Sequence, residues 1–281
     1  MICTRCKKEH NEDTKWCEPC KVKIREKDRK RREKYPEKIR EKNRRQYAKN
    51  PEKFRERERL RNATVRRKYQ EIKRGAERRN IPFDITEDFV GHLTDKECFY
   101  CGEETTKMKR NSIDRLDNTV GYVESNCVSC CGTCNRMKRC LDANTFVERC
   151  SQVSLHNDHE GTMCNFWDDI KGYYSYADYK YRMKNKDFQL TKEQYDTLRR
   201  GNCTYCGRTC SKTHTNGIDR VDNTCGYILD NCISACYDCN AAKGTMNVEE
   251  FINKCTLISR KEHDIPEMPR CINIQTRNRP S

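Results

Sequence analysis

Cysteine pairs are the side chains whose type and spacing most directly imply chemistry in this sequence. The chain has 281 residues and 22 cysteines, and six of its seven Cys-x2-Cys pairs fall into three sets of four. Four thiolates in two such pairs are a common tetrahedral ligand set for structural Zn²⁺. Because no apolar signal region follows Met1, we expect an intracellular protein with up to three zinc ions, in which these cysteines form no disulfides. The expected zinc ligands are Cys3, Cys6, Cys17, Cys20, Cys98, Cys101, Cys131, Cys134, Cys203, Cys206, Cys236 and Cys239.

A second group of polar residues lies in a stretch that occurs twice. Residues 83–150 align with residues 188–255 at a constant offset of 105 residues, without an insertion. Such a long register indicates that one module was duplicated. Besides the cysteines, both copies keep an Asp-Arg pair, a Gly-Tyr pair and an Asn directly after Cys-x2-Cys. These residues are Asp114, Arg115, Tyr122 and Asn135 in module one, and Asp219, Arg220, Tyr227 and Asn240 in module two.

The pattern of each module predicts the elements that position these residues. A Thr N-cap, Thr86 or Thr191, precedes a short amphipathic helix, and the first cysteine pair follows that helix. An apolar-alternating strand, an Asp-Asn-x2-Gly turn and a second short strand then predict a β-hairpin. The second cysteine pair begins a helix that carries Asn and Lys on one face. The expected fold class is small α+β, with two tandem zinc-bound modules, an N-terminal four-cysteine zinc ribbon and a basic helical arm.

Basic residues are concentrated in one segment. The formal net charge is +15, and residues 21–80 contain 27 Lys or Arg against 10 Asp or Glu. A Pro-Glu pair at Pro36 and again at Pro51 predicts short helices that restart at each proline. Apolar residues are too sparse here for a separate core. We therefore expect this arm to bind an anionic polymer through its phosphates.

Composition limits the size of the core and helps to set the expected domain boundaries. Hydrophobic residues make up 34% of the chain and charged residues 36%, which excludes a large apolar core. No segment approaches the ~18 apolar residues of a membrane-spanning helix, so we expect no membrane partner. Phe146, Cys150, Phe251 and Cys255 are expected on core-packing helices. The expected segments are the zinc ribbon at 1–20, the basic arm at 21–80, module one at 81–150, a linker at 151–187, module two at 188–259 and a disordered tail at 260–281.

A zinc-stapled hairpin followed by a helix, with Asp on the first strand and Asn on the helix, resembles the ββα-metal (HNH) endonuclease family. The resemblance covers residues 83–150 and 188–255. It is strongest to the subgroup in which the Asp-His pair of the family reads Asp-Arg, as in PacI-type restriction endonucleases and phage HNH enzymes. It implies a metal-dependent enzyme with two active sites in one chain that hydrolyses phosphodiester bonds in DNA, with RNA as the alternative substrate.

The same resemblance implies a role for each duplicated polar residue. Asp114 and Asn135 would hold one catalytic Mg²⁺ or Mn²⁺ against the scissile phosphate. Arg115 would clamp phosphate oxygens, and Lys138 would assist at the same phosphate. Because the usual histidine is missing and arginine is a poor base, Tyr122 becomes the group expected to accept a proton or to attack directly. The corresponding residues of module two are Asp219, Asn240, Arg220, Lys243 and Tyr227.

Two other interpretations remain open. A zinc-dependent nucleic-acid-binding protein that does not cleave would have the same fold and basic arm, and the Arg-for-His difference favours it. A thiol redox protein would need an exposed Cys-x2-Cys pair of low pKa, which the doubled quartets argue against. Tandem modules with abundant Lys and Arg are typical of proteins encoded by phages, mobile elements and large DNA viruses. Two modules in one chain would make a monomer sufficient for two cuts.

Overall fold

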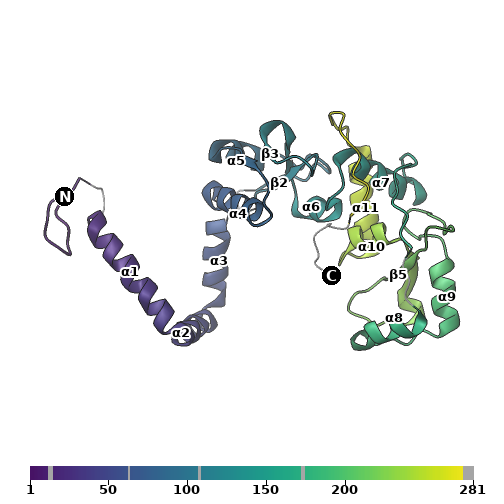
Figure 1. Cartoon of the computed structure of the whole chain (residues 1–281), viewed down its shortest axis with the longest axis horizontal. Helices are drawn as coiled ribbons and strands as arrows, with labels where there is room; N and C mark the ends of the chain where they lie inside the picture. The colour runs from purple at the N-terminus through teal and green to yellow at the C-terminus, as the bar shows by residue number, and fades with distance from the viewer. Residues whose placement is uncertain (12–14, 63, 107–108, 172–174, 275–281) are drawn as a thin grey trace. The chain divides into compact units, whose positions relative to one another are not determined.

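The computed structural model describes residues 1–11, 15–62, 64–106, 109–171 and 175–274. It divides into two compact units, Met1–Arg61 and Asn62–Ser281, which are considered separately (Figure 1). Among the described residues, no helix combines the length and the apolar character that a bilayer crossing requires.

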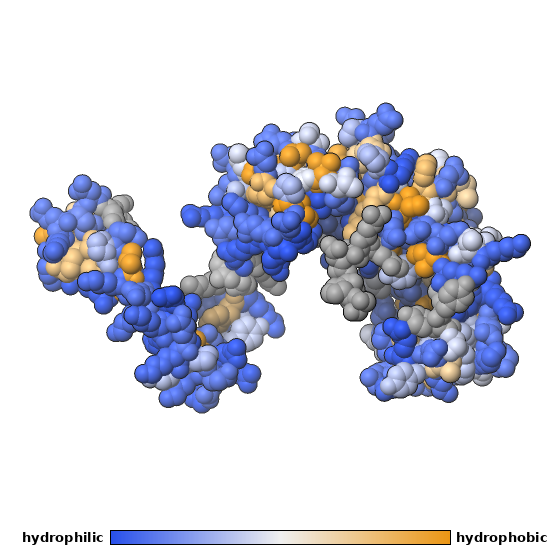
Figure 2. Space-filling model, in the orientation of Figure 1, coloured by the Kyte–Doolittle hydropathy of each residue, from blue (hydrophilic) through white to orange (hydrophobic). Residues whose placement is uncertain are grey.

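The first unit holds a small cysteine cluster and three helices in succession. Helix α1 (Glu18–Lys34) is followed by α2 (Pro36–Lys49) and α3 (Pro51–Asn62). The two later helices each begin at a proline, as the repeated Pro-Glu pair predicts, because proline suits the first helical turn. Helix α2 has no buried residue, and Figure 2 shows mostly hydrophilic side chains over α1 and α2. These helices therefore expose their basic side chains instead of forming a core.

Module one, in the second unit, is built around an antiparallel hairpin. Strand β2 (Ser112–Arg115) pairs with β4 (Cys127–Cys130), so that Asp114 lies opposite Val128. The helix before the hairpin is capped as predicted, because the Thr86 side chain accepts a hydrogen bond from the amide of Phe89. The other elements of module one are α4 (Val65–Arg78), β1 (Phe83–Asp84), α5 (Glu87–Thr94), β3 (Tyr122–Val123), the 3-10 helix η1 (Glu124–Asn126), α6 (Gly132–Lys138) and α7 (Ala143–His156).

Module two repeats this order. Strand β5 (Gly217–Arg220) pairs antiparallel with β6 (Cys232–Ala235). The helix before this hairpin begins after Thr191, which forms a reciprocal capping box with Gln194. The order of cysteine pair, hairpin, cysteine pair and helix is thus confirmed in both copies. The other elements are α8 (Tyr176–Arg182), the 3-10 helix η2 (Lys184–Lys186), α9 (Lys192–Arg200), the 3-10 helix η3 (Leu229–Asn231), α10 (Tyr237–Lys243) and α11 (Val248–Arg260).

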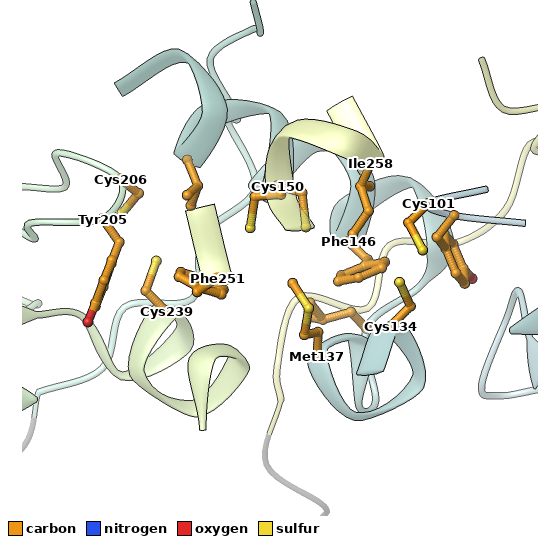
Figure 3. Close-up of a cluster of buried hydrophobic side chains, with 14 of the residues drawn as sticks. Cys101, Cys134, Met137, Phe146, Cys150, Tyr205, Cys206, Cys239, Phe251 and Ile258 are labelled. Carbon is orange, nitrogen blue, oxygen red and sulfur yellow. The ribbon is translucent and has the colours of Figure 1, made fainter. Parts of the chain in front are cut away.

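The two modules share one core, at which α7 packs against α11. Figure 3 shows Tyr205, Cys206, Cys239 and Phe251 on one side, Cys101, Cys134 and Phe146 on the other, and Cys150 between them. The expectation that Phe146, Cys150, Phe251 and Cys255 belong to a core is confirmed, since all four are buried.

Polar contacts at this interface are reciprocal. The Asn157 side-chain amide, just after α7, donates to the carbonyl of Tyr205 at 2.8 Å. Across the interface, Nε2 of His263, just after α11, lies 3.1 Å from the carbonyl oxygen of Tyr100. Equivalent residues also lie together, because Cys150 and Cys255 are both buried in the shared cluster and interact with each other. These contacts give the interface an approximate two-fold character.

Three of the expected segment boundaries differ from the structure. Helix α4 packs on α5 and belongs to module one, so the basic arm ends near residue 61 instead of residue 80. The expected linker at 151–187 contains the end of α7, the buried Cys164 and helix α8, which packs on α9. Residues 261–274 of the expected disordered tail are ordered against the core, while 275–281 lie outside the described residues. The tail is held by its backbone: the amide of Cys271 donates to Asp142 at 2.8 Å, and the carbonyl of Ile272 accepts from Arg149 at 2.7 Å.

Truncating Phe251 to alanine should lower the free energy of unfolding by about 3–5 kcal/mol, because a fully buried aromatic ring leaves a cavity at the shared core. Leu257→Ala on the same helix is the matched control, since Leu257 is 51% exposed. Chemical denaturation of the zinc-loaded protein measures both. Equal losses in the two variants would contradict the assignment of Phe251 to the core.

Candidate functional site

Three cysteine quartets form compact clusters, as predicted. In each quartet the four sulfur atoms lie within 4.8 Å of one another, so each set could hold one zinc ion. The second pair of each module also begins a helix: the Cys131 side chain accepts the amide of Cys134 at 3.4 Å, and Cys236 accepts that of Cys239 at 3.4 Å. A hydrogen bond from Cys101 is the main cause that lowers the pKa of Cys98 to about 3. Thiolates are the form that binds zinc.

No other group of this kind is found in the described part of the chain. The search covered sets of three or more His, Cys, Asp or Glu side chains close enough to share an ion, and it finds the three quartets. His156, His159 and Cys164 therefore do not form such a set. The remaining buried cysteines, including Cys127 and Cys130, pack as small core residues.

The hairpin places Asp114 in a buried network. Its side chain is 5% exposed, and its Oδ2 accepts a hydrogen bond from the Tyr100 hydroxyl at 2.7 Å. The Lys138 ammonium, which is fully buried, lies 3.1 Å from the same oxygen. Burial, followed by the Asp114 carboxylate, raises the pKa of Tyr100, so that this phenol remains a donor. Module two repeats the network, with Asp219 Oδ2 at 2.6 Å from Tyr205 and 3.0 Å from Lys243.

This network corrects the expected role of Lys138 and Lys243. Both lysines are buried, and besides the aspartate each donates to a backbone carbonyl, that of Arg115 at 2.8 Å or of Arg220 at 3.1 Å. They are therefore structural partners of the two aspartates and are not placed to contact a phosphate directly. A charge this deeply buried is stabilised only when it is paired.

Arg115 is directed to the turn that follows its strand. Successive side chains of a strand point to opposite faces, so Asp114 and Arg115 could meet one phosphate only if the strand bent. The Arg115 guanidinium instead donates to the carbonyls of Asn118 at 3.0 Å and Val120 at 2.6 Å, and it lies 5.1 Å from the ring centroid of Tyr122. In module two, Arg220 makes the same contacts with the turn and lies 5.1 Å from the ring of Tyr227.

The four predicted residues of module one nevertheless line one cleft of about 280 Å³. The amide nitrogen of Asn135 donates to the carbonyl of Ile113 at 3.4 Å, which fixes the amide beside the strand that carries Asp114. In module two, Asn240 donates to Ile218 at 3.2 Å. The lining of the module one cleft includes Asp114, Arg115, Tyr122, Asn135, Arg78, Arg79 and Arg139.

Three arginines of this cleft were not predicted as site residues. Arg78 and Arg79 come from the end of α4, and Arg139 directly follows α6. Arg79 donates to the Tyr122 hydroxyl at 3.1 Å. The basic composition of residues 21–80 concealed Arg78 and Arg79, because they read as part of a uniformly charged arm. Comparison of the two copies would have revealed them, since the equivalent residues of module two are Met183 and Lys184.

The surroundings of the two tyrosines also differ. Tyr122 contacts the cationic Arg79, whereas Tyr227 in module two packs edge-on against the ring of Tyr179 of α8, with centroids 5.8 Å apart. Burial, together with the neighbouring Tyr227, raises the pKa of Tyr179. Tyr179 packs among Phe188, Tyr195 and Tyr227, with ring centroids 5.3–5.8 Å apart. Tyr176 and Tyr179 of α8 thus serve as packing residues, whereas Tyr181 is exposed.

Comparison with known proteins finds one relative that is similar to this chain in sequence. Over 191 residues it is 35% identical to an uncharacterized protein of Acanthamoeba polyphaga mimivirus. The match covers 66% of this chain and 36% of the mimivirus protein, so the chain spans about a third of that relative. No protein-family model matches the sequence, and no solved structure matches it.

The purified protein should contain three zinc ions per chain. Replacing Cys98 and Cys101 with serine should reduce the content to two and lower the melting temperature, because the hairpin loses its link to α6. Metal content is measured by inductively coupled plasma mass spectrometry. Cys225→Ser, at an exposed cysteine outside the quartets, should retain all three ions. Three ions in the double variant would contradict the assignment.

Replacing Lys138 with methionine should destabilise the protein by about 3–5 kcal/mol, because the Asp114 carboxylate would remain buried without its cation. Adding Asp114→Asn should restore part of the loss by removing that charge. Lys109→Met serves as the control, since Lys109 pairs with Glu103 at 2.6 Å but is 71% exposed. A Lys138→Met loss no larger than that of Lys109→Met would refute the buried pair.

Proposed function

We propose that this protein is a metal-dependent endonuclease of the ββα-metal (HNH) type that hydrolyses phosphodiester bonds in DNA. The observation that carries the proposal is the module one cleft: Asp114, Arg115, Tyr122 and Asn135 come from β2, β3 and α6 and line one hollow beside a zinc-compatible quartet. The same four residue types recur around the hairpin of module two. The cleft is rich in arginine, and guanidinium groups suit phosphate oxygens.

The donor set of the cleft fits Mg²⁺ or Mn²⁺ better than zinc. It offers the carboxylates of Asp114 and Glu71 and the side-chain amides of Asn118 and Asn135, with no thiol or imidazole among the lining residues. Mg²⁺ is commonly held by one or two protein oxygens and completes its shell with water and substrate phosphate. A bound ion would supply charge neutralisation at the reacting phosphate. Lys138 and Tyr100 occupy Oδ2 of Asp114, which leaves Oδ1 as the oxygen for this purpose.

The other side chains of the cleft have separable tasks. Hydrolysis joins the oxygen of a water molecule to phosphorus and breaks one phosphorus–oxygen bond, and the leaving oxygen takes up a proton. Arg115 holds the turn and the ring of Tyr122 in place. Arg79 orients the Tyr122 hydroxyl. Because every arginine of the cleft stays protonated, Tyr122 is the group we assign to accept the proton of the attacking water, for which it has to be in the phenolate form.

The basic helices support DNA as the substrate. Helices α1 and α2 carry many exposed Lys and Arg side chains. Each of these that lies on a phosphate releases a counterion, which gives affinity without sequence readout. The mimivirus relative is consistent with a large DNA virus as one setting for such a protein.

A second interpretation, a nucleic-acid-binding protein that does not cleave, has one observation in its favour. Asp114, Arg115 and Asn135 each have a structural partner in the chain: Lys138, the carbonyl of Val120 and the carbonyl of Ile113, respectively. The fold would therefore require these residues even if no reaction took place. Binding of DNA without cleavage is the outcome that distinguishes this interpretation.

Cleavage of supercoiled plasmid by zinc-loaded protein tests the proposal. Nicked or linear product should form with Mg²⁺ or Mn²⁺, disappear with EDTA, and disappear in the Asp114→Ala/Asp219→Ala double variant. If each module cuts one strand, Asp219→Ala alone should convert linear product to nicked circles. Asp230→Ala, at an exposed carboxylate of module two, is the charge-matched control. Tight plasmid binding without cleavage in either metal would contradict the proposal and support the binding protein.

A further inference from the structure

The backbone at Arg139 has a conformation that side chains other than glycine rarely adopt. Its φ is 55° and its ψ is −119°, just after the end of α6. At the equivalent point of module two stands Gly244, with φ 57° and ψ −116°. Both residues close their helix in the same way, with the amide of Arg139 donating to Asn135 at 3.3 Å and that of Gly244 donating to Asn240 at 3.0 Å. Module one thus keeps an arginine in a strained conformation to which glycine is suited.

The contacts of Arg139 within the protein do not explain why an arginine is present. Its side chain is exposed and makes one hydrogen bond, from Nη2 to the carbonyl of Ala241 at 3.0 Å. A single exposed hydrogen bond stabilises a fold only weakly, and module two forms the same helix end without it. Strained residues that persist in this way are concentrated at functional sites.

The position of Arg139 offers the explanation. Its side chain lines the module one cleft together with Arg78 and Arg79, which lie at the end of α4. Together with Asp114 and Asn135, these residues surround the space that the proposed function assigns to a phosphate. In module two the three corresponding positions hold Met183, Lys184 and Gly244. The two modules therefore share their buried networks but differ in the wall of the cleft.

We propose that Arg78, Arg79 and Arg139 form an arginine wall that binds a phosphate of the DNA backbone in module one, and that module two, where Lys184 is the one cation at the three corresponding positions, binds a phosphate more weakly there. The inference rests on the proposed function and deepens it by making the two sites unequal. Guanidinium groups are planar, permanently charged and able to bond two phosphate oxygens at once. Arg139 carries the argument, because its backbone strain opposes folding and module two has no arginine there.

Arg139→Gly separates the two consequences of this arrangement. The melting temperature should rise, because glycine removes the strain. At the same time, affinity for a labelled 30-base-pair duplex, measured by fluorescence anisotropy at several salt concentrations, should fall severalfold. The slope of log affinity against log salt should become shallower by about 0.9, the value for one lost phosphate contact. Arg139→Lys should keep most of the wild-type salt dependence. Arg139→Ala should show the shallower slope without the rise in melting temperature.

Two controls define the outcomes that would overturn the inference. Arg136→Ala removes an equal charge from the exposed face of α6, outside the cleft. Equal effects of Arg136→Ala and Arg139→Gly on the salt slope would refute the phosphate contact. A lower melting temperature in Arg139→Gly would contradict the claim that the backbone at Arg139 is strained and that glycine relieves this strain. Both readouts are independent of cleavage, so a wild-type protein that binds but does not cut would contradict the nuclease while leaving the arginine wall standing.

Discussion

The second unit depends on two cysteine quartets that lie inside its core. Their sulfur atoms are buried together with Phe146, Phe251 and the rest of the shared cluster. With about a third of the residues hydrophobic, the chain has little apolar area to stabilise a fold of this size. Coordination of a zinc ion by each quartet would replace part of that area, because it would join the start of the hairpin to the start of the following helix. Each candidate site residue lies on one of these joined elements or in the loop between them.

The buried Asp–Lys pairs connect this scaffold to the clefts. Asp114 lies on β2 and Lys138 on α6, so their contact fixes the helix against the strand and brings Asn135 beside it. Burial of the pair costs desolvation free energy, and loss of either partner would leave an uncompensated buried charge. Its repetition in module two, at nearly the same distances, shows that the scaffold was retained after duplication. The positions of Arg78, Arg79 and Arg139, which bear no such constraint, have diverged between the modules.

The sequence predicted what depends on local pattern. Cysteine spacing, Thr caps, proline starts and the order of the hairpin elements all follow from interactions between residues near each other along the chain. The four polar residues of each site were found because duplication marked them. The sequence did not predict the burial of Lys138, because that burial depends on a partner in another element. The prediction of a disordered tail was wrong for residues 261–274, because their polar composition gives no sign of the backbone hydrogen bonds to Asp142 and Arg149.

The contact of Cys150 with Cys255 has an evolutionary meaning. A contact between equivalent residues is the arrangement of a homodimer of identical subunits. The packing of the two modules is thus consistent with a single-module ancestor that paired with itself before duplication joined two copies in one chain. A homodimer cannot change one cleft without changing the other. Fusion removed that restriction, and the exchange of Arg139 for Gly244 is a difference that only the fused gene could acquire.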